Sequence, residues 1–151
     1  MVWKVRAKVT AAVVAPIAMV VCTLPALAVA DASAPALVQF NGVLCSLSAN
    51  DVPRGGGPMA VCQLSDGGPF PQAPFSTTKP YPKLNLAVVR GAGPFQYELG
   101  SVAGGQPVNL ALGQTYHANG WTFLAAEGRS TVSYDSTGHG IWIGPDFVHP
   151  N

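Results

Sequence analysis

The sequence predicts an all-β fold, and three observations lead to that prediction. Short runs rich in β-branched and aromatic residues recur along the chain, separated by turns that contain glycine or proline. No segment carries the 3.6-residue apolar stripe of a surface helix over a useful length. Two cysteines lie beyond the N-terminal apolar run, as in small disulfide-bonded domains. We therefore expect a small antiparallel sandwich or partly open barrel of about eight strands with one disulfide.

The N-terminus is typical of a secretory signal peptide. Three basic residues precede an apolar run over residues 9–24, and small residues follow it. We expect cleavage after Ala28 or Ala30, which makes residues 1–30 the signal peptide and residues 31–151 a single β domain.

Two alternatives to cleavage are open. An uncleaved membrane anchor would need roughly 20 apolar residues, but the run is shorter and Pro16 interrupts it. Acylation of Cys22 would make a lipoprotein, although the bulky Val21 before it is a poor residue to cleave after.

The charge balance argues against a nucleic-acid partner. The whole chain has a net charge of +1, and cleavage removes three of its eight basic residues but none of its seven acidic ones. The mature domain then has a net charge of about −2 and no basic stripe. We expect it to be secreted or to lie in the cell envelope, with no membrane span after cleavage, no cofactor and an unknown extracellular ligand.

Cleavage also leaves two cysteines, Cys45 and Cys62. An even pair in an exported chain predicts a disulfide. A strand over residues 37–46, with a bulge or bend at Gly42, precedes a second strand over residues 59–64. Asparagine, aspartate and glycine between them indicate a long loop. We expect the disulfide to join the two strands of this hairpin.

The middle of the chain begins with a Gly/Pro-rich loop over residues 65–83. Its prolines remove amide donors and favour extended geometry. We expect a long surface loop whose aromatic residues cap the core. The alternative is a recognition segment that offers prolines and aromatics, Tyr81 among them, to a partner. Further strands are expected over residues 84–90, 95–99 and 108–112.

Residues 113–148 predict a meander. Asn119 and Gly120 suit a type I′ turn, which pairs Ala118 with Trp121. A second hairpin centred on residues 128–129 would pair Phe123 with Tyr134. Both registers place one set of residues on a common apolar face: Tyr116, Trp121, Phe123, Ala125, Val132 and Tyr134.

Four features occur in order along the chain: N-G-x-x-C at residues 41–45, the later Cys62, G-Q-T-Y at 113–116 and T-G-H-G-I-W-I at 137–143. In these features the chain resembles a group of small exported actinobacterial, largely mycobacterial, proteins of unknown function. The resemblance implies an exported β domain with a two-cysteine hairpin and a closing meander, but no chemistry. The group often has a second cysteine pair, which by spacing would fall at Leu124 and Ser133, residues that our register places opposite each other.

His139 lies between two glycines and is the first candidate for chemistry, as a base, a ligand or a binding residue. The alternative is a structural turn in which the His139 side chain bonds a backbone carbonyl. A small hydrolase would use His139 with Asp135, but the chain has no G-x-S-x-G nucleophile motif. A metal module would draw on His117, His139, His149 and Asp146, which lack the usual ligand spacing.

Aromatic residues supply the remaining candidates. Trp121 and Trp142, with Tyr116 and Tyr134, would form either a stacking platform for a sugar or peptide, or part of the core. The binding candidates are therefore His139, Trp142 and Tyr81, and no catalytic or metal site is assigned. The sequence favours a non-enzymatic binding protein, with a hydrolase or a metal module as the alternatives.

Overall fold

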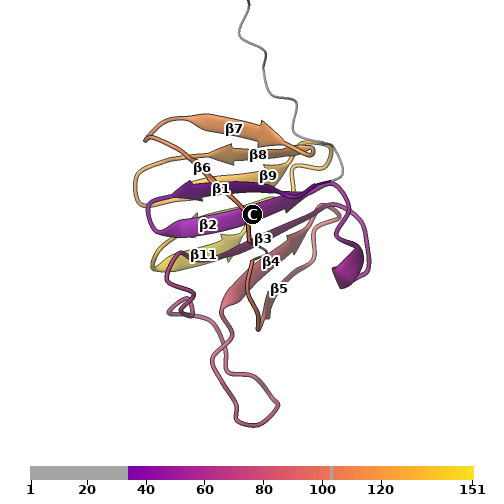
Figure 1. The fold of residues 1–151 in the computed structure, drawn as a ribbon, viewed down its shortest axis with the longest axis vertical. Helices are drawn as coiled ribbons and strands as arrows, with labels where there is room; N and C mark the ends of the chain where they lie inside the picture. The colour runs from indigo at the N-terminus through magenta and orange to yellow at the C-terminus, as the bar shows by residue number, and fades with distance from the viewer. Residues whose placement is uncertain (1–33, 103) are drawn as a thin grey trace, which may run out of the picture.

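The computed structural model describes residues 34–102 and 104–151, and it confirms the all-β prediction. Among these residues, eleven strands form two sheets that pack as a sandwich, and one short 3₁₀ helix lies between the second and third strands (Figure 1). The predicted signal peptide, its cleavage sites and Cys22 lie outside the described residues. Within those residues, no helix is long and apolar enough to cross a bilayer.

The first sheet has six strands in the order β5-β4-β3-β2-β1-β6. Adjacent strands in this sheet pair antiparallel, except that β1 and β6 pair parallel. Its strands are β1 (Ala36–Phe40), β2 (Val43–Ser48), β3 (Met59–Leu64), β4 (Leu86–Arg90), β5 (Phe95–Glu98) and β6 (Val108–Asn109).

The second sheet is an antiparallel meander in the order β11-β10-β9-β8-β7. Its strands are β7 (Thr115–Ala118), β8 (Trp121–Leu124), β9 (Ser130–Tyr134), β10 (Gly140–Gly144) and β11 (Phe147–Pro150). We expected about eight strands. The number is higher because several glycine turns divide the chain into shorter strands than the composition suggested.

The core lies between the sheets, because alternate residues of each strand point inward. The first sheet contributes Val38, Cys45, Leu47, Cys62 and Val89, among others, and the second contributes Trp121, Phe123, Val132, Ile141 and Ile143. Trp121 is fully buried, and its Nε1–H donates to the carbonyl oxygen of Ser48 at 3.0 Å. This bond joins the two sheets through the core.

The first predicted strand is wrong, because residues 37–46 form a hairpin rather than one strand. Asn41 and Gly42 have φ of 47° and 77°. Positive φ at both positions is the geometry of a type I′ turn, so the chain reverses where we expected a bend. Strands β1 and β2 then pair from Phe40 opposite Val43.

The predicted disulfide is confirmed. Cys45 of β2 and Cys62 of β3 lie directly opposite each other and are bonded. Both are fully buried on the inner face of the first sheet. The disulfide therefore joins the β2–β3 hairpin beneath its loop, as expected.

One hairpin register in the meander is confirmed and the other is wrong. Ala118 pairs with Trp121 across the Asn119–Gly120 turn. In the next hairpin Trp121, not Phe123, lies opposite Tyr134, which is a shift of two residues. Leu124 and Ser133 are therefore not opposite each other. A shift of two keeps each side chain on its face, so the predicted apolar face is confirmed.

The β8–β9 hairpin is centred one residue earlier in the chain than we expected, on residues 127–128 instead of 128–129. On the other side of β8, Ala125 extends the pairing with β7, since its N–H donates to the Gln114 carbonyl and its own carbonyl accepts from the Gly113 N–H. Ser130 Oγ accepts from the Ala126 N–H at 3.3 Å, so residues 125–129 form a longer loop than the two-residue turn we expected.

The outer face of the first sheet carries a second apolar cluster. Met59 and Val61 of β3 pack with Leu86 and Val88 of β4, and all four are buried. They are covered because β5 and β6 lie at opposite edges of the sheet, so the chain between them must cross its face. We call residues 99–102 and 104–107 the strap. Its Val102 packs on the cluster.

The predicted Gly/Pro-rich loop extends away from the sheets at the bottom of Figure 1, between β3 and β4. Phe70 is fully buried in the core, which confirms the expected capping at that residue. Phe75 and Tyr81 do not cap the core, because they are 69% and 49% exposed. The loop is therefore anchored at one end and open at its tip.

Candidate functional site

A pocket opens on the outer face of the first sheet, between the strap and the loop that joins β2 to β3. Its volume is about 280 Å³. We call residues 49–58 the Arg54 loop. The pocket is lined by Pro35, Ser46, Ser48, Asn50, Asp51, Val52, Pro53, Arg54, Val61 and Val102. Half of these are apolar and half are polar, so the pocket offers both kinds of contact.

Two serine hydroxyls contribute to the floor of this pocket. Cys45 and Leu47 of β2 point into the core, so Ser46 and Ser48 between and beyond them point outward. They are only 7% and 5% exposed. Among the described residues, neither hydroxyl has a hydrogen-bond partner. Both therefore keep their full capacity to bond a molecule in the pocket.

The Arg54 loop forms one wall, and its own hydrogen bonds fix its shape. Asp51 caps the 3₁₀ helix η1 (Val52–Arg54), since its Oδ1 accepts from the Arg54 N–H at 3.2 Å. The backbone then closes between Asp51 and Gly57, whose carbonyl accepts from the Asp51 N–H at 2.9 Å. This tight turn requires positive φ at three successive residues, and glycine, which adopts positive φ easily, occupies all three: Gly55, Gly56 and Gly57.

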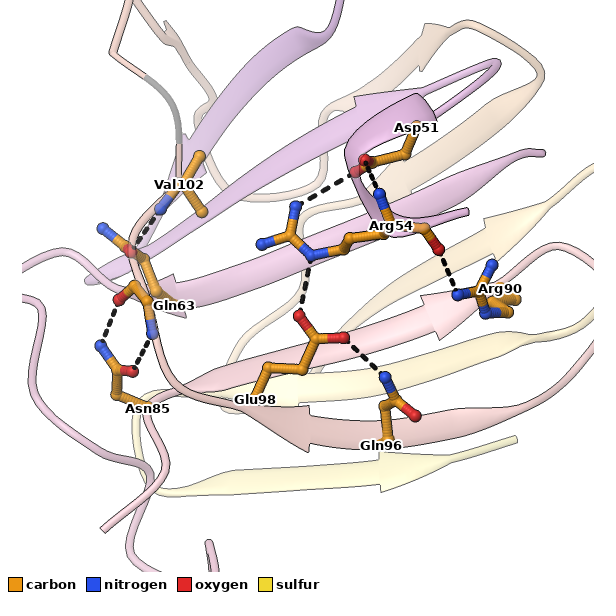
Figure 2. A network of polar contacts seen from close by, with 9 residues as sticks. Asp51, Arg54, Gln63, Asn85, Arg90, Gln96, Glu98 and Val102 are labelled. Carbon is orange, nitrogen blue, oxygen red and sulfur yellow. Dashed lines mark hydrogen bonds and ion pairs between the residues drawn. The ribbon is translucent and has the colours of Figure 1, made fainter. Parts of the chain in front are cut away.

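Ion pairs attach this wall to the sheet (Figure 2). Arg54 Nε donates to Glu98 of β5 at 2.8 Å, and Arg54 Nη1 donates to Asp51 at 3.2 Å. Arg90 donates to the carbonyl oxygens of Arg54 and Gly56. Burial opposes the charge of Arg54, but the bonds and charges of Glu98 and Asp51 outweigh it and raise the pKa of the guanidinium above its ordinary value. Arg54 is therefore a charged but compensated group.

The strap forms the other wall and is held by two amide side chains. Gln63 Oε1 accepts from the Val102 N–H at 2.9 Å. Asn85 exchanges two bonds with the backbone of Gly100, at 2.8 and 3.0 Å (Figure 2). Since both walls are bonded to the sheet, the pocket is already formed without a ligand.

His139 lies outside this pocket, in the turn between β9 and β10. Its ring lies against Gly93, where an added Cβ would come within 3.2 Å of two ring atoms. The neighbouring Thr137 Oγ1 donates to the Gly91 carbonyl at 2.5 Å. The alternative in which the His139 side chain bonds a backbone carbonyl is not seen among the described residues. Instead, the His139 carbonyl accepts from the Tyr134 N–H at 2.8 Å.

Asp135 is not hydrogen-bonded to His139. Its Oδ1 accepts from Thr122 Oγ1 at 2.5 Å, and Thr122 Oγ1 lies 2.9 Å from His117 Nδ1. Because Thr122 donates its only proton to Asp135, the ring nitrogen of His117 must donate to Thr122. Asp135 is thus linked through Thr122 to His117, which lies farther away in the sequence than His139 does.

The remaining candidates have different surroundings. Trp121 belongs to the core, and Tyr116 and Tyr134 pack against it partly buried. Trp142 is 37% exposed on the outer face of the second sheet, and Tyr81 lies at the exposed loop tip. Within residues 34–102 and 104–151, no three His, Cys, Asp or Glu side chains come together as a metal site would require.

Sequence analysis missed the pocket. Its one local signal is the alternation in β2, where two serines interleave with core residues. The groups that build its walls come from distant parts of the chain, with Glu98 44 residues from Arg54 and Val102 39 residues from Gln63.

Fold and pocket together define a disulfide-bonded β-sandwich with a preformed site on one outer face. Searches of protein-family models, curated proteins and solved structures each found no match to the chain. The resemblance to the exported actinobacterial group therefore stays a prediction.

Proposed function

We propose that the chain is a non-enzymatic binding domain, secreted or held in the cell envelope, which takes a small uncharged molecule into the pocket beside Arg54. The signal-peptide pattern at the N-terminus supports export. The Cys45–Cys62 disulfide also favours an oxidising compartment outside the cytoplasm.

The observation that carries the proposal is that Ser46 and Ser48 line the pocket and that neither hydroxyl bonds another described residue. Since no buried side-chain polar atom of the described residues lacks a partner, these hydroxyls are accessible from the pocket, where a ligand can bond them. Here the hydroxyls line a pocket with apolar groups from Val61 and Val102. A ligand that accepts or donates at the serines and rests its apolar part on the valines would satisfy both.

The charges of the pocket favour a neutral ligand. Arg54 is paired with Asp51 and Glu98, so it presents no uncompensated positive charge. An anion would have to compete with two carboxylates, and a cation would have to displace the guanidinium. The volume is at the small end of ligand sites and suits a molecule of about 10 to 15 non-hydrogen atoms.

Binding fits the pocket better than hydrolysis does. Neither His139 nor Asp135 lines it. Among the described residues, no histidine is hydrogen-bonded to Ser46 or Ser48, as activation of a serine nucleophile by a neighbouring base would require.

The test uses three probes that differ in charge but share a short alkyl chain: N-butylacetamide, pentanoate and pentylammonium. In amide NMR spectra of the mature domain, we expect N-butylacetamide to shift Ser46, Val61 and Val102 most. Replacing both Ser46 and Ser48 with Ala should weaken this binding about thirtyfold, since each lost hydrogen bond contributes about 1 kcal/mol.

Ser133→Ala is the matched control, because Ser133 is an outward serine on the other sheet. It should leave the affinity unchanged. The assignment of this pocket would be refuted if pentanoate or pentylammonium bound as tightly as N-butylacetamide. An unchanged affinity for N-butylacetamide after the double substitution would refute it as well.

A further inference from the structure

A second surface feature lies on the outer face of the second sheet. Trp142 of β10 stacks on His149 of β11, with ring centroids 5.9 Å apart, and Phe147 stacks on His149 at 6.3 Å. The Arg129 guanidinium lies 5.7 Å from the Trp142 ring centroid and 4.9 Å from that of Phe147. We call these four residues the Trp142 patch.

Gly144 explains how Arg129 reaches the aromatic rings. A Cβ at Gly144 would lie 2.3 Å from the carbonyl oxygen of Gly128, so only glycine lets the loop before β9 rest on β10. Gly144 also pairs with Phe147. The loop therefore places Arg129 beside the Phe147 ring.

The charge of Arg129 is unpaired within the part of the chain that the structure describes. No carboxylate there forms an ion pair with Arg129, and its side chain donates no hydrogen bond to those residues. Its position over two rings restrains the guanidinium, while the residue is exposed. A restrained guanidinium with free donors is suited to bidentate binding of a carboxylate.

The rest of this face carries hydroxyl groups. Thr131 lies opposite Trp142, and Ser133 and Thr122 form the neighbouring row with His117. These side chains point outward because Phe123 and Val132 between them point into the core. The face thus combines an exposed indole, one unpaired cation and a row of hydroxyls, of which that of Thr122 is bonded to Asp135 and His117.

We propose that this face binds an acidic polysaccharide, with a sugar ring against Trp142 and its carboxylate on Arg129. One face of a pyranose ring presents C–H groups, which contact an indole well, and its hydroxyls project sideways to polar side chains. The carboxylate supplies the anionic partner that Arg129 lacks among the described residues. This site shares no residue with the pocket and does not depend on the function proposed for it.

The observations favour a glycan over other polyanions. Nucleic acid needs a stripe of cations, whereas Arg129 stands alone on a domain whose mature net charge is about −2. An acidic peptide would pair its backbone with the free edge of β11, but it has no ring whose C–H face could rest on Trp142. The hydroxyl row supplies side-chain bonds suited to sugar hydroxyls instead.

The test compares hexagalacturonate, the neutral cellohexaose and hexaglutamate by calorimetry with the disulfide-bonded mature domain. We expect hexagalacturonate to bind at least tenfold more tightly than either of the others. Trp142→Ala should lower that affinity tenfold or more, and Trp142→Tyr should retain most of it. Arg129→Gln should remove the preference for hexagalacturonate over cellohexaose.

Two variants control for ring and charge at other sites. Phe75→Ala removes a more exposed aromatic ring, and Lys79→Gln removes a cation, both in the Gly/Pro-rich loop. Each should leave binding unchanged, and circular dichroism should show every variant folded. Equal affinity for hexaglutamate, no affinity for hexagalacturonate, or an unaffected Arg129→Gln variant would each overturn the proposal.

Discussion

Asn119 both forms a turn and links the two sheets. Its φ of 53° suits the type I′ turn before β8. Its Nδ2 also donates to the carbonyl oxygens of Leu47, at 2.8 Å, and Ala34, at 2.9 Å, in the other half of the molecule. The turn that joins two strands of the second sheet therefore also holds that sheet to the first.

We predict that Asn119→Gly lowers the free energy of unfolding by about 1–2 kcal/mol. Glycine keeps the positive φ but loses both hydrogen bonds. Asn41→Gly is the matched control, since Asn41 occupies the same turn position in the β1–β2 hairpin and its side chain makes no hydrogen bond within the described residues. It should change stability by a few tenths of a kcal/mol at most. Urea unfolding of both variants measures the difference, and equal losses would contradict the cross-sheet role.

The same two residues show what a local pattern can predict. Asn followed by Gly predicted the turn at Asn119, and the identical pair at Asn41 gave the same turn where we expected a continuous strand. At the candidate site, sequence proximity suggested Asp135 with His139. Strand pairing instead brings Asp135 beside Thr122, because β8 and β9 are neighbours.

At the scale of elements, the β2–β3 hairpin carries the strongest constraint. Its strands pair over six residues each, and the disulfide closes a separation of 17 residues. The β3 strand and both cysteines were predictable, because the apolar run and the exported context are local signals, whereas β2 was predicted only as the end of one longer strand. The register of the β8–β9 hairpin was not, since the five-residue loop over residues 125–129 has no single turn type that fixes where the chain reverses.

Reduction of the disulfide should lower the free energy of unfolding by about 3 kcal/mol on the chain-entropy account. The expected measurement is a lower urea midpoint for the Cys45→Ala/Cys62→Ala variant than for the oxidised domain. Adding reductant to that variant provides the control, and it should have no further effect. An unchanged midpoint would mean that sheet pairing alone holds the hairpin.

At the scale of the whole molecule, the class of fold was predictable and the arrangement of its two outer faces was not. Alternating apolar residues indicate which side of a strand is buried, as the meander shows. They cannot indicate that the strap crosses the first sheet, because this follows from β5 and β6 lying at opposite edges. The pocket depends on that crossing, so it could not be inferred from local pattern.

Export makes a prediction about the intact mature protein. We expect the secreted chain to begin at Val29 or Asp31, as cleavage after Ala28 or Ala30 requires. Intact mass spectrometry should give a mass two hydrogens below the reduced value, and reduction with alkylation should modify two cysteines. A chain that retains residues 1–30, or a lipid on Cys22, would contradict this processing.

The core separates the pocket from the Trp142 patch, since each lies on the outer face of a different sheet. Packed sheets are about 10 Å apart, so the two surfaces point in opposite directions. Occupying one leaves the other uncovered, and substitutions on the two faces should act additively. Under the two proposals, a single copy of this domain would hold a small molecule on one face and a polysaccharide on the other.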